Sequence, residues 1–109
     1  MNRELNFEQI SFQIIASAGE AKTNAINSIK LAKENKIFEA NLLISEAEKS
    51  MIEAEKAHME VVVEEARGSK FIFPVIFMHA EDQLLTTQTI ILMAKEFIEI
   101  YDRFNNVKN

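Results

Sequence analysis

Residues 77–89, FMHAEDQLLTTQT, hold the side chains of this chain that are best suited to chemistry. His79 is followed three residues later by Asp82, and Thr86 and Thr89 continue the series at spacings of four and three. Those spacings place the four side chains on one face of a helix. A histidine, a carboxylate and two hydroxyls on one stripe of an apolar segment make this face a candidate for function.

The imidazole of His79 is suited to phosphoryl chemistry. A neutral imidazole is a nucleophile, and it can take a phosphoryl group on one ring nitrogen while an acceptor holds the other. Gln83 lies one turn from His79, and nearby amides and hydroxyls can hold the added oxygens. A lone histidine on an apolar helix is more often a core residue, so the spacing alone leaves both interpretations open. Thr86 and Thr89 are more simply packing residues that hydrogen-bond within the helix.

The composition favours an all-α protein. Its 109 residues include two glycines and one proline, and Ala, Glu, Lys, Ile and Leu dominate, most of which favour helices. The absence of cysteine excludes disulfides, thiolate metal sites and a cysteine nucleophile. A net charge of −5 without a basic cluster argues against nucleic acid as a partner. No signal peptide and no apolar run of membrane-spanning length appear, so we expect a cytoplasmic protein without membrane insertion.

Two breaks divide the chain into three helices. The polar segment around Asn35 can turn one helix into the next, and Gly68 and Pro74 can end the second helix and open the third. The predicted helices span about 3–33, 36–67 and 74–105. They predict one domain, an antiparallel three-helix bundle over residues 1–109.

The third helix is apolar on most of its circumference. Its polar stripe is narrow, with Glu81, Gln88, Lys95 and Asp102 recurring at seven-residue intervals, and we expect this stripe to be exposed. Three helices alone cannot enclose such a helix, so we predict a homo-oligomer with the third helix lining its centre. Several copies of Asp82 would then converge, and converging carboxylates require a proton or a cation. Symmetry therefore makes Asp82 a candidate metal ligand.

The second helix carries a regular seam of small and apolar residues. It consists of Ala40, Ile44, Ala47, Met51, Ala54, His58 and Val61, at spacings of four and three. We therefore favour a core position for His58, with two alternatives: it makes up for a lost polar contact, or it lies near the site. In the first helix, Gly19 either kinks the helix or admits a close neighbour, and Phe12, Ile15 and Ala18 are candidates to line a pocket around His79.

The segment FPVIFMHAEDQLLTT resembles the stretch M-H-(A/G)-Q-D-H-L-M-T-T of the lactose/cellobiose-type IIA components of the bacterial sugar phosphotransferase system. The likeness covers nearly the whole chain. The segment FQIIASAGEAK is similar to the family's F-x-I-(V/I)-(A/S)-x-A-G-(D/E)-A-(R/K), and EARGSKFIFPV is similar to the loop before its third helix.

The resemblance implies a function in detail. Members are phosphotransferase components that assemble as trimers, nine-helix bundles with the active histidines near the subunit boundaries. His79 would accept a phosphoryl group from the histidine-containing phosphocarrier protein and pass it to a cysteine of the cognate IIB component. The membrane component IIC then imports the sugar, here a β-linked disaccharide with a slight preference for the cellobiose type. Asp82 and its symmetry mates would hold one Mg²⁺ per trimer on the threefold axis.

Several positions depart from the family's motifs, and four of them carry polar or charged side chains. Glu81 replaces the Gln of M-H-(A/G)-Q-D, and Gln83 replaces the histidine after the aspartate. Glu55 replaces the His of E-A-H, and His58 aligns with the Gln of the following Q-T. An extra carboxylate near a phosphohistidine opposes the incoming charge, although we expect Glu81 to lie on the exposed stripe.

The sequence is also compatible with two functions other than phosphoryl transfer. The departures from the family's motifs are also expected in a regulatory or adaptor relative that no longer transfers phosphoryl groups. A third possibility is a metal-stabilised bundle whose only role is oligomerisation. A phosphorylation assay distinguishes the carrier from both.

Overall fold

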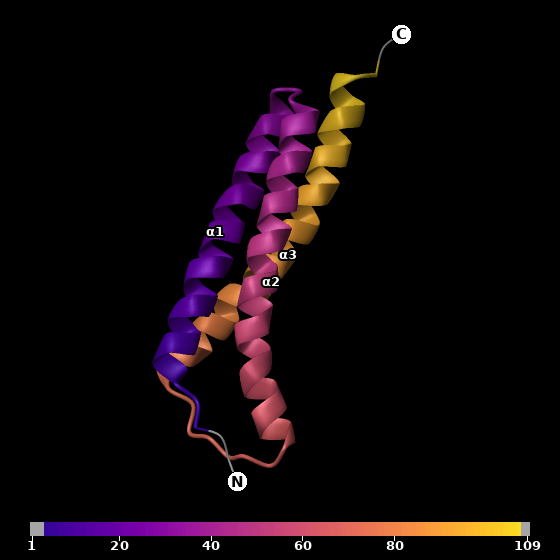
Figure 1. Cartoon of the computed structure of the whole chain (residues 1–109). Coiled ribbons are helices and arrows are strands. Elements are labelled where there is room, and N and C mark those ends of the chain that lie inside the picture. The colour runs from indigo at the N-terminus through magenta and orange to yellow at the C-terminus, as the bar shows by residue number, and fades with distance from the viewer. Residues whose placement is uncertain (1–3, 108–109) are drawn as a thin grey trace.

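A computed structural model describes residues 4–107 as three long helices and confirms the predicted all-α bundle. The helices are α1 (Phe7–Lys33), α2 (Ile37–Ala66) and α3 (Val75–Asn105). The chain runs up α1, down α2 and up α3, so that α1 and α3 are parallel to each other (Figure 1). The bundle is narrow, with extents of 67 × 20 × 18 Å.

Both breaks between helices are Schellman motifs, in which a left-handed residue turns the chain and the next amide bonds back to the helix. Asn35 has φ 61°, and the Lys36 amide donates to the Leu31 carbonyl over 2.9 Å. Gly68 has φ 105°, and the Ser69 amide donates to the Glu64 carbonyl over 3.1 Å. The left-handed ends explain why the helices stop where the sequence predicts.

The first helix begins later than its predicted start near residue 3, which lies outside the described residues. Asn6 is the N-cap, because its Oδ1 accepts a hydrogen bond of 2.9 Å from the Gln9 amide. Such a cap contributes about 1 kcal/mol to helix stability. The other helix ends lie within one residue of the predicted positions.

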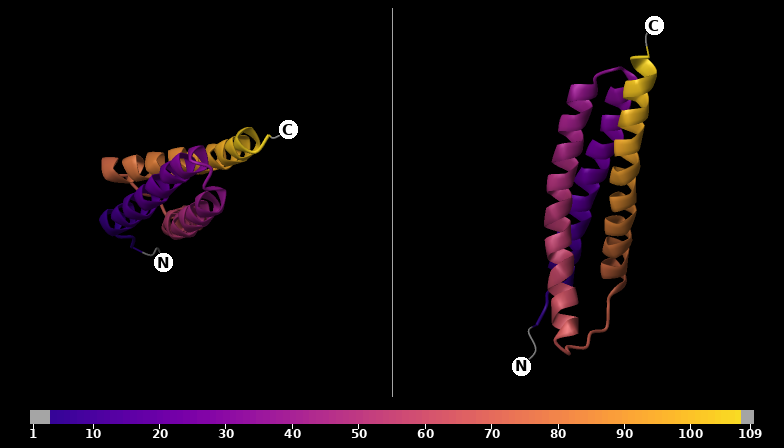
Figure 2. Two further views of the ribbon diagram at one scale, coloured as in Figure 1. Left: turned by 90° about the horizontal axis from the view of Figure 1, so that it is seen from above. Right: turned by 90° about the vertical axis from the view of Figure 1, so that its right-hand side faces the viewer.

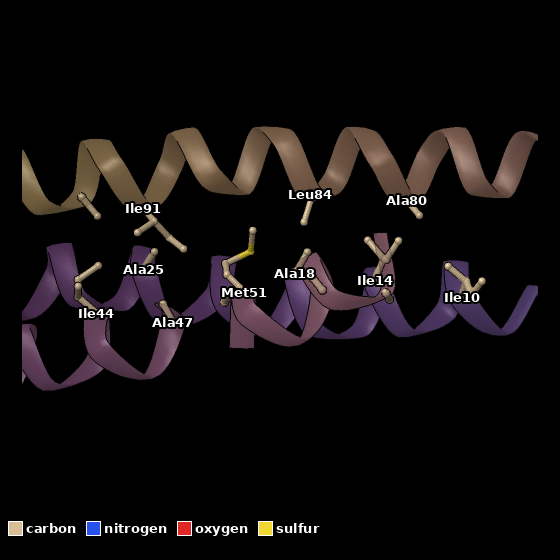
Figure 3. Packing of buried hydrophobic residues seen from close by; sticks show 14 of the residues in the cluster. Ile10, Ile14, Ala18, Ala25, Ile44, Ala47, Met51, Ala80, Leu84 and Ile91 are labelled. Carbon is tan, nitrogen blue, oxygen red and sulfur yellow. The ribbon is translucent and has the colours of Figure 1, made fainter. Parts of the chain in front are cut away.

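The core is built from small residues facing medium-sized ones. In Figure 3, Ala18, Ala25 and Ala47 lie between the helices beside larger side chains such as Leu84 and Met51. The three alanines are fully buried, which allows the helix backbones to approach closely.

The buried seam of α2 differs from the predicted one at a single step. It runs from Ala54 to Ala57 and Val61, whereas His58 lies at its edge with 28% of its side chain exposed. The core interpretation of His58 is therefore wrong. From Ala54 to Val61, a step of three then four passes through Ala57, and a step of four then three passes through His58. Both orders suit a helix of 3.6 residues per turn, and the structure buries the apolar Ala57 and leaves the polar imidazole at the edge.

The outer face of α3 remains open in the single protomer, as its apolar sequence predicts. Large apolar side chains on it are half or more exposed, among them Val75, Met78, Leu85, Leu92 and Ile100. Exposed apolar residues that lie together in this way mark an association surface. Figure 2 shows α3 along one side of the bundle, with α1 behind the space between α2 and α3.

Candidate functional site

An aromatic cluster fixes the start of α3, which carries the candidate site. Phe77, which is 6% exposed, contacts Phe7 edge-on with ring centroids 5.2 Å apart, and it stacks on Phe73 at 5.6 Å. Phe71 also packs edge-on against Phe7, at 5.2 Å. Edge-to-face pairs of this kind add to the free energy gained by burial. The loop after α2 and the first turns of α3 are thereby held against the beginning of α1.

His79 and Asp82 lie on the exposed outer face of α3, as their spacing predicts. Thr86, Thr89 and Met93 continue the same exposed stripe. Both ring nitrogens of His79 are free of partners within the described residues, so a second protein can reach the imidazole. His79 therefore lies at the surface of the protomer and is not a core residue.

The electrostatics of the first turn of α3 favour a negatively charged group at His79. No acidic residue lies in that turn. The amide dipoles of a helix sum to a partial positive charge at its N-terminus, and side chains lean toward that end of the helix. His79 is the fifth residue of α3 and thus lies directly after the first turn.

Asp82 has the ligand type for a hard cation but lacks companions in its own protomer. Among residues 4–107, no group of three or more His, Cys, Asp or Glu side chains is placed to hold a metal ion. Its exposed carboxylate offers oxygen ligands, which Mg²⁺ prefers. Within residues 4–107 of one protomer, Asp82 therefore stands outside any such group of ligands.

Glu81 is partly buried, contrary to the expectation that its whole stripe is exposed. Its side chain is 22% exposed and faces α2, where the Nδ1 of His58 lies 2.6 Å from one carboxylate oxygen and 2.8 Å from the other. Residues two apart on a helix point in different directions, which separates the Glu81 carboxylate from His79. Two of the positions that depart from the family pattern thus contact each other.

Two more polar contacts continue this boundary between α2 and α3. The amide of Gln88 donates to Glu55 over 2.9 Å, and Lys95 pairs with Glu48. Lys95 follows Gln88 by seven residues on α3, and its partner Glu48 precedes Glu55 by seven residues on α2. This is the order of contacts expected between antiparallel helices. The predicted stripe is exposed at Gln88, Lys95 and Asp102, and its edge toward α2 also carries these contacts.

The proposed lining residues around His79 do not form one surface. Ala18 is fully buried in the core, whereas Phe12 is 55% exposed and Ile15 is partly buried. A Cβ added at Gly19 would meet no atom within 4 Å, and α1 continues through it without a break. The expected close neighbour of Gly19 is therefore not a helix of the same protomer.

The arrangement of helices and motif agrees with known proteins. The family model described as "PTS system, Lactose/Cellobiose specific IIA subunit" matches residues 9–102. The chain belongs to this family. The match includes both His79 and Asp82, and it covers most of all three helices.

Individual IIA proteins are similar over almost their full length. The oligo-beta-mannoside-specific EIIA component of Bacillus subtilis is 36% identical, over 93% of this chain and 92% of the relative. The lichenan-specific IIA component of the same organism is 34% identical, over 94% and 92%. A crystal structure of the cellobiose-specific enzyme IIA from Bacillus anthracis superposes with a TM-score of 0.90 at 32% identity, covering 97% of both chains.

Membership of the IIA family makes the chain a component of a sugar phosphotransferase system with a role in phosphoryl transfer. The other proteins of that system, a phosphocarrier and a IIB component, are its implied partners. Within the described residues, none of the helices combines the length and the apolar character needed to cross a bilayer.

Proposed function

We propose that His79 accepts a phosphoryl group from the histidine-containing phosphocarrier protein and passes it to a cysteine of the cognate IIB component. The observation that carries this proposal is the exposed position of His79 near the start of α3, at the His of the M-H-A motif. An acceptor that must meet two proteins in turn has to lie at a surface. The exposed ring on a fixed helix satisfies that requirement.

The transfer needs little covalent help from the chain itself. In the first step the P–N bond of the donor histidine breaks while a ring nitrogen of His79 forms a new P–N bond. In the second step the thiolate of IIB takes the phosphoryl group and His79 regains its free nitrogen. The chain supplies position, through the aromatic cluster under α3, and a favourable helix end without acidic residues.

A trimer with α3 at its centre is part of the proposal. The exposed apolar residues of α3, such as Leu85 and Leu92, would be buried there, at about 1.5–3 kcal/mol for each fully buried side chain. Asp82 lies on the same face, so three copies would converge on the axis. One Mg²⁺ held by these carboxylates would compensate their mutual repulsion.

The sugar is assigned only by similarity of the carriers. The names of the relatives include oligo-beta-mannoside, lichenan and cellobiose. We propose that the cognate transporter imports a β-linked disaccharide, with the cellobiose type preferred. Growth of a deletion strain on a panel of such sugars tests this, since loss of growth on one sugar identifies the substrate.

Phosphorylation with purified proteins tests the central step. The chain is incubated with phosphoenolpyruvate and the two general phosphotransferase proteins, and bound phosphate is counted before and after acid treatment. We expect one acid-labile phosphate per chain, absent from His79→Ala and still present at the end point in His58→Ala. A folded chain that takes no phosphate would instead support the regulatory or adaptor role, and labelling of His79→Ala would overturn the site.

A further inference from the structure

The contact between His58 and Glu81 joins two of the departures from the family motifs. At these positions the motifs have two glutamines, whereas this chain has an imidazole and a carboxylate. The two residues are 23 apart in the sequence and come from α2 and α3, yet their polar atoms lie 2.6–2.8 Å apart. The two departures therefore lie in one contact, which forms a polar link between the helices and adds a carboxylate.

The added charge lies close to the proposed phosphoryl acceptor. Glu81 follows His79 by two residues, and only 22% of its side chain is exposed, so water screens the carboxylate incompletely. A phosphoryl group brings up to two further negative charges to His79. Like charges near a protein surface repel strongly enough to slow a reaction severalfold. An unpaired carboxylate at position 81 would therefore oppose the transfer.

His58 is placed to counter this effect. Its Nδ1–H can donate to the carboxylate both in the neutral tautomer that carries the proton on Nδ1 and in the cation. The contact with both oxygens of Glu81 holds the carboxylate on the side of α2, whereas His79 lies on the exposed outer face. The next polar contact along this boundary, between Glu55 and Gln88, contains no cation that could replace His58.

We propose that His58 is a positioning residue for phosphoryl transfer at His79. It holds the Glu81 carboxylate against α2 by hydrogen bonding and, in its cationic form, balances the charge, so that this acid does not oppose the incoming phosphoryl group. The inference rests on the proposed function of His79. It explains how the chain tolerates an acid where the family motif has a neutral amide.

A double-mutant cycle tests the pair. Initial rates of phosphorylation by the phosphocarrier protein are measured for the unmodified chain, His58→Gln, Glu81→Gln and the double variant, with Asp82 unchanged throughout. We expect His58→Gln to be slower by about threefold to tenfold, because a neutral amide cannot carry the positive charge that the imidazole can carry beside the acid. The double variant, which restores the two glutamines of the family motifs, should recover at least the rate of the unmodified chain.

Glu48→Gln is the matched control. It removes another charged pair between the same helices, that with Lys95, but two helical repeats farther from His79. Unfolding free energies of all variants are measured in parallel. A purely structural role for His58 predicts that the double variant is as slow as His58→Gln, and that result overturns the inference. Equal rates for His58→Gln and the unmodified chain overturn it as well.

The remaining outcomes separate this inference from the proposed function. If the unmodified chain takes no phosphate on His79, the proposed function fails and the inference fails with it. If His58→Gln does not fold, Glu81→Gln is compared with the double variant, because without the acid the loss of His58 must leave the rate unchanged. A slower double variant in that comparison overturns the role of His58 while the function of His79 stands.

Discussion

The hydroxyl of Thr86 donates a hydrogen bond of 2.8 Å to the main-chain carbonyl of Asp82, one turn earlier in α3. Thr89 makes the same type of contact to the Leu85 carbonyl, at 3.5 Å. Both hydroxyls are thus used within the helix, which agrees with their interpretation from sequence as packing and hydrogen-bonding residues. Of the four polar side chains on this stripe, the imidazole of His79 and the carboxylate of Asp82 are therefore the two that are available for a reaction or a ligand.

Replacement of Thr86 by valine should therefore have little effect on the proposed reaction. The change keeps the shape of the side chain and removes a hydroxyl that bonds only within α3, so stability should shift by about 0.5 kcal/mol or less. Phosphorylation rate and thermal stability are compared with those of the unmodified chain. A tenfold loss of rate without a loss of stability would contradict our assignment of Thr86 as structural.

The open face of α3 predicts a charge-sensitive assembly. Leu85→Lys should convert the proposed trimer to folded monomers at micromolar concentration, because the buried ammonium groups of three copies would repel each other near the axis. Leu42→Lys on α2 is the matched control, since the two leucines are 56% and 53% exposed. Mass from light scattering and helicity from circular dichroism report the result. Dissociation by both changes, or by neither, would argue against α3 as the central surface.

Asp82→Leu should preserve or raise the stability of the proposed trimer. The change removes three converging carboxylates and adds apolar surface at the axis, so that both repulsion and the need for a cation disappear. Thermal unfolding and light scattering at the same protein concentration measure the effect. If the variant falls apart into monomers, Asp82 does not face the axis.

Metal removal provides an independent test of the same position. A chelator should lower the Tm of the unmodified chain by a few degrees, because a cation that binds only the assembled form stabilises it. Added Mg²⁺ should restore the Tm. Asp82→Leu should respond to neither treatment, and an equal response of the variant would place the metal at other residues.

Local signals in the sequence explain why the fold was predictable. Asn35 and Gly68 adopt the left-handed conformation that ends a helix, and Pro74 precedes the first residue of α3. These residues act through their own backbones, so their effect does not depend on the rest of the fold. The start of α1 was harder to predict, because its N-cap depends on a single hydrogen bond from the Gln9 amide to the Asn6 side chain.

Contacts between helices were harder to predict than the helices themselves, and the surroundings of His79 depend on such contacts. His79 and Asp82 share a face by spacing alone, which requires only the geometry of one helix. The position of Glu81 depends on the rotation of α3 against α2, and the burial of His58 depends on a choice between two spacings that both suit a helix. Periodicity gives the faces of each helix but not the partner of each face, so the contact between His58 and Glu81 appears only in the assembled bundle.

The aromatic cluster predicts that packing under α3 affects the reaction from a distance. Phe77→Leu keeps an apolar side chain but loses the ring contacts with Phe7 and Phe73, at a cost of about 1–2 kcal/mol. Because Phe77 precedes His79 by two residues, the phosphorylation rate should also fall, by roughly threefold, as the turn loosens. Phe104→Leu is the control, since Phe104 is 76% exposed near the opposite end of α3 and should change neither quantity. A destabilised Phe77→Leu variant with an unchanged rate would show that the cluster stabilises the bundle without positioning the histidine.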